Sequence, residues 1–252
     1  MAVIPVIEEV REKLQDIISK RNLGNELVQV KIGTLTAKQA IGEPSRRDYP
    51  LIEGKEVMIE AQFQDSFGQA FTDRPHDFSG SVNDILGLDL SFNDNRAVFI
   101  ATVNAVMAHL GMATGVRHCH DEEPEKCALQ IARYIKERFG MVKVTMVGLQ
   151  PAILENLVNV FGVDNVRCTD LNPANVGSHK YGAEIWDGRT DTARLIAWCD
   201  VPLVTSSTIV NNTFDGIRQE VNLHGKPLII FGVTGAGVAA LLGLDRLCFE
   251  PH

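Results

Sequence analysis

From residue 142 onward, short apolar segments alternate with longer amphipathic ones, and this alternation constrains the fold more than any other feature of the sequence. The apolar segments predict strands at 142–148, 166–171, 201–206 and 227–232, and the segments after them predict helices at 151–161, 191–198, 213–221 and 238–244. Strands that alternate with helices over short connections form a parallel sheet with helices on its faces. The second half of the chain is therefore predicted to be a Rossmann-like parallel α/β domain.

The first half of the chain has a different pattern. Apolar residues at helical spacing predict a helix at 5–21 and another from Asn93 or Asp94 to Gly111. Period-two alternation predicts an antiparallel meander with strands at 27–33, 56–63 and 66–72, and 34–41 is expected to be the hairpin partner of the first strand. A loop with a short helix near 82–86 is expected to follow. This half is expected to be a small α+β domain. The segment from Gly111 to Pro124 has no periodicity, so we expect domains at 1–117 and 118–252.

Charge, cysteine content and hydropathy exclude several classes of protein. Lys and Arg number 24 and Asp and Glu 32, a net charge of −8, whereas a general nucleic-acid binder needs clustered cations. The cysteines number 5, an odd count, and the N-terminal residues are charged, so reduced thiols and a cytoplasmic location are expected. The uncharged segment between Lys226 and Asp245 is interrupted repeatedly by Gly and Pro, which argues against a membrane span.

Ligands of parallel α/β sheets bind beyond the carboxyl ends of the strands, and this rule directs attention to four loops. Gly148 would let the backbone approach a ligand, and Pro151 can start the helix that follows. Asp170 ends the next strand, about 20 positions on, where an acidic residue binds a ribose hydroxyl in dinucleotide folds. Asn172 follows in the same loop. A plain strand-to-helix turn and an Asp or Asn turn cap are the structural alternatives.

The most informative segment is 205–213, Thr-Ser-Ser-Thr-Ile-Val-Asn-Asn-Thr, which crowds hydroxyl and amide groups between a strand and a helix. Helix capping needs one or two such residues, whereas a nest for a carboxylate, a phosphate or a polar ring uses several. The candidate ligand-binding residues here are Ser207, Thr208, Asn211 and Thr213. Residues 235–240 match G-x-G-x-x-A, but no second strand with an acidic residue follows, so a tight turn beside the same cleft is expected.

Two further segments carry candidates outside these loops. His118, Cys119 and His120 combine imidazole and thiolate, which borderline transition metals prefer, although a solvated linker between the domains is the alternative. Cys127 falls in register with apolar helix positions and is expected in the core. Asn104 lies on the otherwise apolar face of the predicted helix that ends at Gly111. It either makes a structural hydrogen bond or reaches into a cleft between the domains.

The order and spacing of these segments resemble a known family, the putative heavy-metal chelation proteins. The resemblance is carried by Ala101–Ala105, Val147–Gly148 with Pro151, Asp170, Val204–Thr213 and the turn Phe231–Thr234. It covers essentially the whole chain and implies an enolase N-terminal-like domain followed by a Rossmann-like domain. The sequence departs from the family's usual loop, T-G-S-T-L-x-N-G-T, because Ser206 and Asn212 replace its two glycines.

The resemblance implies a ligand site between the domains, bordered by Thr234, and the condensation or hydrolysis of a pterin-, flavin- or siderophore-like compound linked to heavy metals. A non-catalytic chelator that binds metal through His118, Cys119 and His120 is the second hypothesis. A methyltransferase that uses S-adenosylmethionine is the third, weakened because the loop at Gly148 lacks a glycine-rich cofactor turn. The expected partner is a small molecule, with a transition metal as the candidate cofactor, and not a nucleic acid or a membrane. Catalysis and a homo-oligomeric state are left open.

Overall fold

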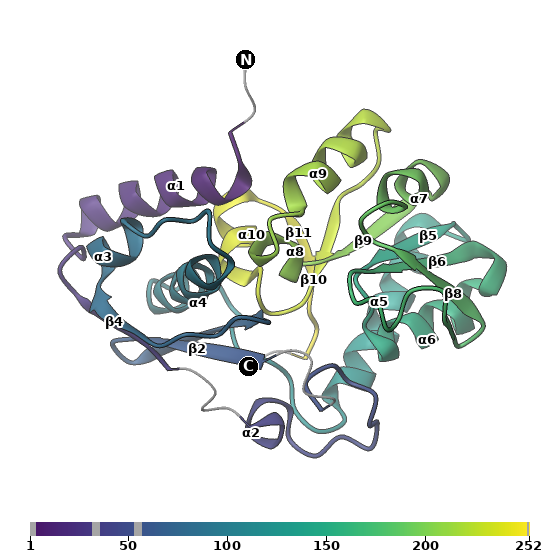
Figure 1. Ribbon diagram of the computed structural model, residues 1–252, viewed down its shortest axis with the longest axis horizontal. Helices are drawn as coiled ribbons and strands as arrows, with labels where there is room; N and C mark the ends of the chain where they lie inside the picture. Colours follow the sequence, from purple (N-terminus) through teal and green to yellow (C-terminus); the bar gives the residue numbers. More distant parts are fainter. Residues whose placement is uncertain (1–3, 32–35, 53–56, 251) are drawn as a thin grey trace.

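The computed structural model describes residues 4–31, 36–52, 57–250 and 252, which form two sheets with their helices (Figure 1). The first sheet is antiparallel, in the order β3 (Ser66–Thr72), β2 (Val57–Phe63), β1 (Leu27–Lys31) and β4 (Phe78–Ser81). The helices in this half of the chain are α1 (Val6–Arg21), α2 (Ala37–Ile41), α3 (Val82–Leu86) and α4 (Asn93–His109).

The second sheet lies in the C-terminal part of the chain and is parallel except at one edge. Its order is β11 (Asp245–Leu247), β10 (Ile229–Phe231), β9 (Val201–Thr205), β5 (Val144–Val147), β6 (Val166–Asp170), β8 (Ala183–Asp187) and the antiparallel β7 (His179–Lys180). Its helices are α5 (Glu123–Phe139), α6 (Pro151–Phe161), η1 (Val163–Asn165), α7 (Thr192–Trp198), α8 (Ser207–Val210), α9 (Phe214–Leu223) and α10 (Ala236–Leu242).

Helix α4 is the centre of the molecule. Every residue from Arg96 to Met107 is buried, and a helix that is apolar on all sides has to be covered on all sides. Strands β2 and β3 cover one side, and α8 and α10 of the C-terminal part cover another (Figure 1). A Cβ on Gly68 of β3 would lie 2.2 Å from the backbone nitrogen of Ala105, so glycine allows the strand to pack directly on the helix.

The strands of the parallel sheet distribute their side chains between two cores because successive residues point to opposite faces. In β10, Ile229 and Phe231 belong to the core beneath α5 and α6, whereas Ile230 belongs to the core that surrounds α4. In β9, Leu203 and Val204 divide in the same way. The first domain therefore buries α4 against one face of the second domain's sheet.

The predicted fold class is confirmed: an antiparallel α+β part is followed by a mostly parallel α/β part. Helix α6 covers the predicted 151–161, and α1, α3, α4, α7, α9 and α10 lie close to their predicted positions. Strands β4, β7, β8 and β11 and helix α8 were not predicted. Among the described residues, no helix is both long and apolar enough to cross a membrane.

The hairpin strand predicted at 34–41 is wrong. Residues 34 and 35 lie outside the described residues, and the rest of that segment forms helix α2. The cause is a capping box: Thr36 Oγ1 accepts a hydrogen bond from the Gln39 backbone N–H at 3.2 Å, and the Gln39 side chain accepts one from the Thr36 N–H at 2.9 Å. These reciprocal bonds satisfy donors that a helix start leaves unpaired.

Candidate functional site

The carboxyl ends of the parallel strands open into a cleft of about 1210 Å³ between the two domains. The loops after β5, β6, β9 and β10 form one wall, and Ile41, residues 48–51 and residues 71–73 of the first domain form another. The predicted residues that line this cleft are Gly148, Asp170, Asn172, Ser207, Thr208, Asn211, Thr213, Thr234, His118 and Cys119. Two of the predicted residues, Asn104 and His120, are not part of its wall.

Gly148 is required by close packing. Its φ is +90°, and a Cβ there would lie 2.3 Å from Cγ2 of Thr205 at the end of β9. Two adjacent strands can therefore end side by side, with their loops meeting at one point of the cleft. The Gly148 backbone N–H donates to the Thr169 carbonyl at 2.9 Å and holds the turn in place.

Asp170 joins the loops that follow β5 and β6. Its Oδ2 accepts a hydrogen bond from the Leu149 backbone N–H at 3.0 Å, and its Oδ1 accepts from the Asn172 N–H at 2.7 Å and the Asn175 side chain at 3.3 Å. A carboxylate has about four acceptor positions, so one remains for a ligand. Asn172 Oδ1 caps the next turn by accepting from the Ala174 N–H at 3.0 Å. Asp170 and Asn172 therefore both cap turns in this loop, as the structural alternative to ligand binding predicts.

The polar segment after β9 folds into the short helix α8, and several of its side chains shape the loop itself. Thr208 Oγ1 donates to the Thr205 carbonyl at 2.6 Å, and Thr213 Oγ1 donates to the Thr208 carbonyl at 3.4 Å. Asn211 Oδ1 accepts from Asn93 at the start of α4, at 3.4 Å. Each of these groups keeps at least one polar position that no protein atom uses.

Ser206 is the residue that reasoning from sequence missed. Its side chain is 1 % exposed and lines the cleft, and its buried hydroxyl has no hydrogen-bond partner in the described structure. The Ser206 backbone N–H donates to Phe231 O at 2.9 Å, and a Cβ on Gly235 would lie 2.7 Å from the Ser206 Cβ, so Ser206 packs closely against the turn after β10. The available signal was its departure from the family's usual glycine at this position.

The Asn104 side chain makes structural hydrogen bonds and does not reach into the cleft. The fully buried side chain donates to the carbonyls of Gln69 at 2.8 Å, Thr234 at 3.0 Å and Val233 at 3.3 Å. Its Oδ1 accepts from the Gly237 backbone N–H at 2.7 Å. These contacts join α4 to β3 and to the turn between β10 and α10, so Asn104 fastens the domains together beside the cleft. The segment 235–240, which matches G-x-G-x-x-A, therefore packs against α4 through its contact with Asn104.

The three candidate metal ligands, His118, Cys119 and His120, do not converge on one point in the structure. His118 Nδ1 lies 2.6 Å from the Cys119 carbonyl oxygen, and its ring packs edge-on against Phe71. His120 is turned the other way, with its ring 5.6 Å from that of His252. No group of three or more His, Cys, Asp or Glu residues in the described parts of the chain is arranged to hold a metal ion. Burial lowers the pKa of His118 to about 4, so its ring is neutral at physiological pH.

Three cysteines come together at the wall of the cleft: Cys119, Cys127 of α5 and Cys248 after β11. A hydrogen bond from the Cys248 thiol lowers the pKa of Cys127, and the same bond raises the pKa of Cys248. Burial raises the pKa of Cys119. Cys127 is buried, as its register predicted, but it also faces the cleft, which the register did not indicate.

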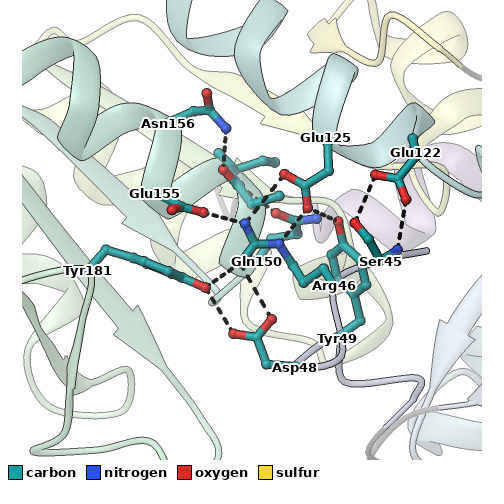
Figure 2. A network of polar contacts seen from close by, with 12 residues as sticks. Ser45, Arg46, Asp48, Tyr49, Glu122, Glu125, Gln150, Glu155, Asn156 and Tyr181 are labelled. Carbon is teal, nitrogen blue, oxygen red and sulfur yellow. Dashed lines mark hydrogen bonds and ion pairs between the residues drawn. The ribbon is translucent and has the colours of Figure 1, made fainter.

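Arg46 lies at the centre of a polar network whose members Asp48 and Tyr49 line the cleft (Figure 2). Its guanidinium contacts Glu125 of α5 at 2.5 Å, Asp48 at 3.5 Å, and also Glu155 of α6 and the Tyr181 hydroxyl. The phenols complete the group: Tyr49 donates to Glu125 at 2.8 Å and Tyr181 donates to Asp48 at 2.9 Å. We call these six residues the Arg46 cluster. Burial, followed by the bond to Asp48, raises the pKa of Tyr181 to about 12.

The fold and cleft define a two-domain α/β protein whose polar site lies at the carboxyl edge of a parallel sheet and is covered by an antiparallel domain. The model of the DUF364 family, described as putative heavy-metal chelation, matches residues 134–244, and this confirms the resemblance found in the sequence. No curated protein matches the chain.

Two solved structures have the same fold. A DUF364 protein of unknown function from Pyrococcus horikoshii superposes with a TM-score of 0.56 at 16% identity, covering 91% of this chain and 80% of that one. A second, from Desulfitobacterium hafniense, gives a TM-score of 0.50 at 12% identity over 74% of this chain and 72% of that one. At these identities the likeness establishes the fold.

Proposed function

We propose that this protein binds a small polar organic molecule in the cleft between its two domains. The observation that carries the proposal is the Ser206 hydroxyl, which is buried in the cleft wall without a hydrogen-bond partner. Leaving a buried hydroxyl unpaired costs about 1–3 kcal/mol, so a ligand that hydrogen-bonds to Ser206 recovers that energy. Ser207, Thr208, Asn211 and Thr213 line the same part of the cleft.

The charges of the cleft narrow the chemistry of the ligand. Four carboxylates, those of Asp48, Asp73, Asp170 and Glu220, line the cleft, together with the cations Lys180 and Arg189. This balance favours a ligand that offers hydroxyl, amide or amine donors over a highly charged polyanion.

Apolar side chains supply the other part of the surface, among them Phe71, Leu171, Ile217 and Phe231. A ligand pocket that is mostly apolar with a few convergent polar groups suits a flat ring with polar edges. The pterin, flavin or siderophore-like compounds implied by the family resemblance have this character. In the proposal Asp170 accepts a donor of the ligand, Asn172 and Thr234 border the ring, and Gly148 keeps the strand ends together.

A plug at Gly216 tests the proposal. Gly216 of α9 lines the cleft, and a Cβ there meets nothing within 4 Å, so Gly216→Phe should fill the cleft without disturbing the fold. Gly87→Phe is the matched control, because Gly87 lies outside the cleft and its Cβ would make only ordinary contacts, the nearest at 3.5 Å. Pterin, riboflavin and a hydroxamate siderophore are titrated by fluorescence quenching or calorimetry, with S-adenosylmethionine as the probe of methyltransferase character.

We expect at least one of the three organic classes to bind the wild type and Gly87→Phe equally and to bind Gly216→Phe at least tenfold more weakly. Asn211→Ala should reduce the same affinity while leaving the melting temperature unchanged, because its amide makes one long contact to Asn93. Equal binding to all variants would place the ligand elsewhere and contradict the proposal. Binding of S-adenosylmethionine alone would replace it with the methyltransferase hypothesis.

A further inference from the structure

The thiol cluster formed by Cys119, Cys127 and Cys248 brings the C-terminal segment after β11 against the start of α5 and the residues before it. Cys127 lies in the first turns of α5, and Cys248 follows β11, the edge strand of the parallel sheet. Both thiols line the cleft, and the backbone of the residue that follows Cys248 contacts the Cys127 sulfur. Cys127 is buried and Cys248 is partly exposed, so the pair is accessible from one side only.

The surroundings of this pair resemble those of a sulfur that binds a metal. The Phe249 backbone N–H donates a hydrogen bond to the Cys127 sulfur at 3.4 Å, and outer contacts of this kind orient metal ligands and hold their negative charge. The guanidinium of Arg246, two residues before Cys248, acts on that thiol as a nearby positive charge. Arg246 is fixed in place because it donates to the carbonyls of Thr114 at 2.9 Å and Gly232 at 3.2 Å.

We propose that Cys127 and Cys248 bind one soft, linearly coordinating cation, of the Cu(I) type, at the wall of the cleft. Thiolates select soft ions such as Cu(I), and two opposed thiolates complete a linear coordination shell. A structural zinc ion needs four ligands, and no group of even three is arranged for a metal in the described parts of the chain.

Binding releases one proton from each thiol to solvent and forms two metal–sulfur bonds. With a monovalent ion, the two thiolates leave one net negative charge beside Arg246. The site goes beyond the organic ligand proposed for the cleft, since it uses none of the residues assigned to that ligand.

The experiment uses Ag(I), an air-stable ion with the charge and ligand preference of Cu(I). The reduced full-length protein receives one equivalent of Ag(I) in chloride-free buffer, followed by an excess of glutathione, and native mass spectrometry reports the metal that remains. Glutathione removes an ion held by a single thiol, whereas a two-thiol chelate resists it. Cys127→Ser and Cys248→Ser are compared with Cys199→Ser, whose thiol is buried at the end of α7 and does not line the cleft.

We expect the wild type and Cys199→Ser to retain one ion per chain, and Cys127→Ser and Cys248→Ser to lose it. A second measurement needs no variant: bound Ag(I) should protect Cys127 and Cys248 from iodoacetamide in wild-type protein, as read by peptide mapping. Retention of silver by both serine variants would overturn the proposal, as would equal loss from all proteins. Alkylation of the pair at an unchanged rate, or a disulfide between the two cysteines in the freshly purified protein, would also overturn it.

Discussion

The two domains meet on two sides of the cleft, and different interactions hold each contact. Beside α10, the Asn104 side chain is fully buried and makes four hydrogen bonds, all to backbone groups. At the other contact, the Arg46 side chain is 16 % exposed and faces three carboxylates and two phenols from both domains (Figure 2). The first contact is dry and neutral, and the second is charged and reached by solvent.

The difference in burial and charge distinguishes a contact whose strength is independent of salt from one whose strength depends on salt. Removing a buried group that satisfies several backbone partners leaves each of them unpaired, and this cost does not depend on salt. Charge pairs near the surface are screened by salt and contribute little on average. We therefore expect the Asn104 contact to hold the domains together and the Arg46 cluster to control access to the cleft.

The largest effect is expected at Asn104. Asn104→Ala leaves the Gly237 N–H and up to three carbonyls without their partner, so we expect it to lower the free energy of unfolding by about 3–5 kcal/mol. Asn156→Ala is the control, because Asn156 makes one hydrogen bond, to Ala152 O at 2.9 Å, along α6. Urea unfolding should show less than about 1 kcal/mol for the control. Equal losses would show that the two domains do not depend on the Asn104 contact.

The next comparison introduces the same methyl group in two helices of the C-terminal part, α10 and α9. In Gly237→Ala the Cβ would lie 2.9 Å from Val103 Cγ1 and 3.0 Å from Asn104 Oδ1, so crowding should lower stability by about 2 kcal/mol. In Gly216→Ala the Cβ meets nothing, so helix propensity should raise stability by about 0.5–1 kcal/mol. Thermal unfolding checks the opposite signs. Two changes of one sign would refute the close packing of α10 on α4.

A smaller effect, and one that depends on salt, is expected at Arg46. Arg46→Ala leaves Glu125, Glu155 and Asp48 without their cation, and we expect a loss of about 1 kcal/mol because the site is partly exposed. The loss should shrink in high salt, and hydrogen exchange of the segment 43–51 should become faster. Lys20→Ala, which removes an exposed pair with Asp16 at 2.6 Å, is the control. Unchanged hydrogen exchange at 43–51 would contradict the expected role of the Arg46 cluster in controlling access to the cleft.

The smallest effect on stability, and the largest on binding, is expected at Ser206. Ser206→Ala removes an unpaired buried hydroxyl, so it should raise the free energy of unfolding by about 1 kcal/mol, the lower end of the cost of leaving such a group unpaired. Affinity for the cleft ligand should fall at least tenfold. Thr102→Ala is the contrast, because the buried Thr102 hydroxyl is paired with the Val98 carbonyl at 2.9 Å. Calorimetry measures ligand affinity and urea unfolding measures stability for both variants, which distinguishes the unpaired Ser206 hydroxyl from the paired Thr102 hydroxyl. A strongly destabilised Ser206→Ala would show that the Ser206 hydroxyl has a structural partner.

Much of the second domain could be predicted because its signals are local. The helix that begins at Pro151 and the strand that ends at Asp170 follow from apolar runs bounded by proline, glycine and aspartate. Strand β8, Ala-Glu-Ile-Trp-Asp, was missed because it has five residues and contains no continuous apolar run like those of the central strands. Strand β11 was missed because Asp245–Leu247 is short and polar, and its place at the edge of the sheet depends on pairing with β10.

The candidate site was predictable in outline, but the arrangement of its side chains was not. The rule that ligands bind beyond the carboxyl ends of parallel strands led to Gly148, Asp170 and the segment 205–213, which the structure brings to one cleft. The Arg46 cluster was not predicted because its residues come from segments that are far apart in the sequence. The His118–Cys119–His120 segment suggested metal binding by its composition, but its side chains point to different neighbours.

The sequence by itself determined the fold class, the order of the elements and the edge of the sheet at which polar groups gather, because hydrophobic periodicity and turn residues act over a few neighbouring positions. The tertiary structure alone decided that Asn104 is a fastener, that Ser206 is left unpaired in the cleft and that Cys127 meets Cys248. Those outcomes depend on which distant backbone groups and thiols packing brings within hydrogen-bond distance, and no local pattern encodes that distance.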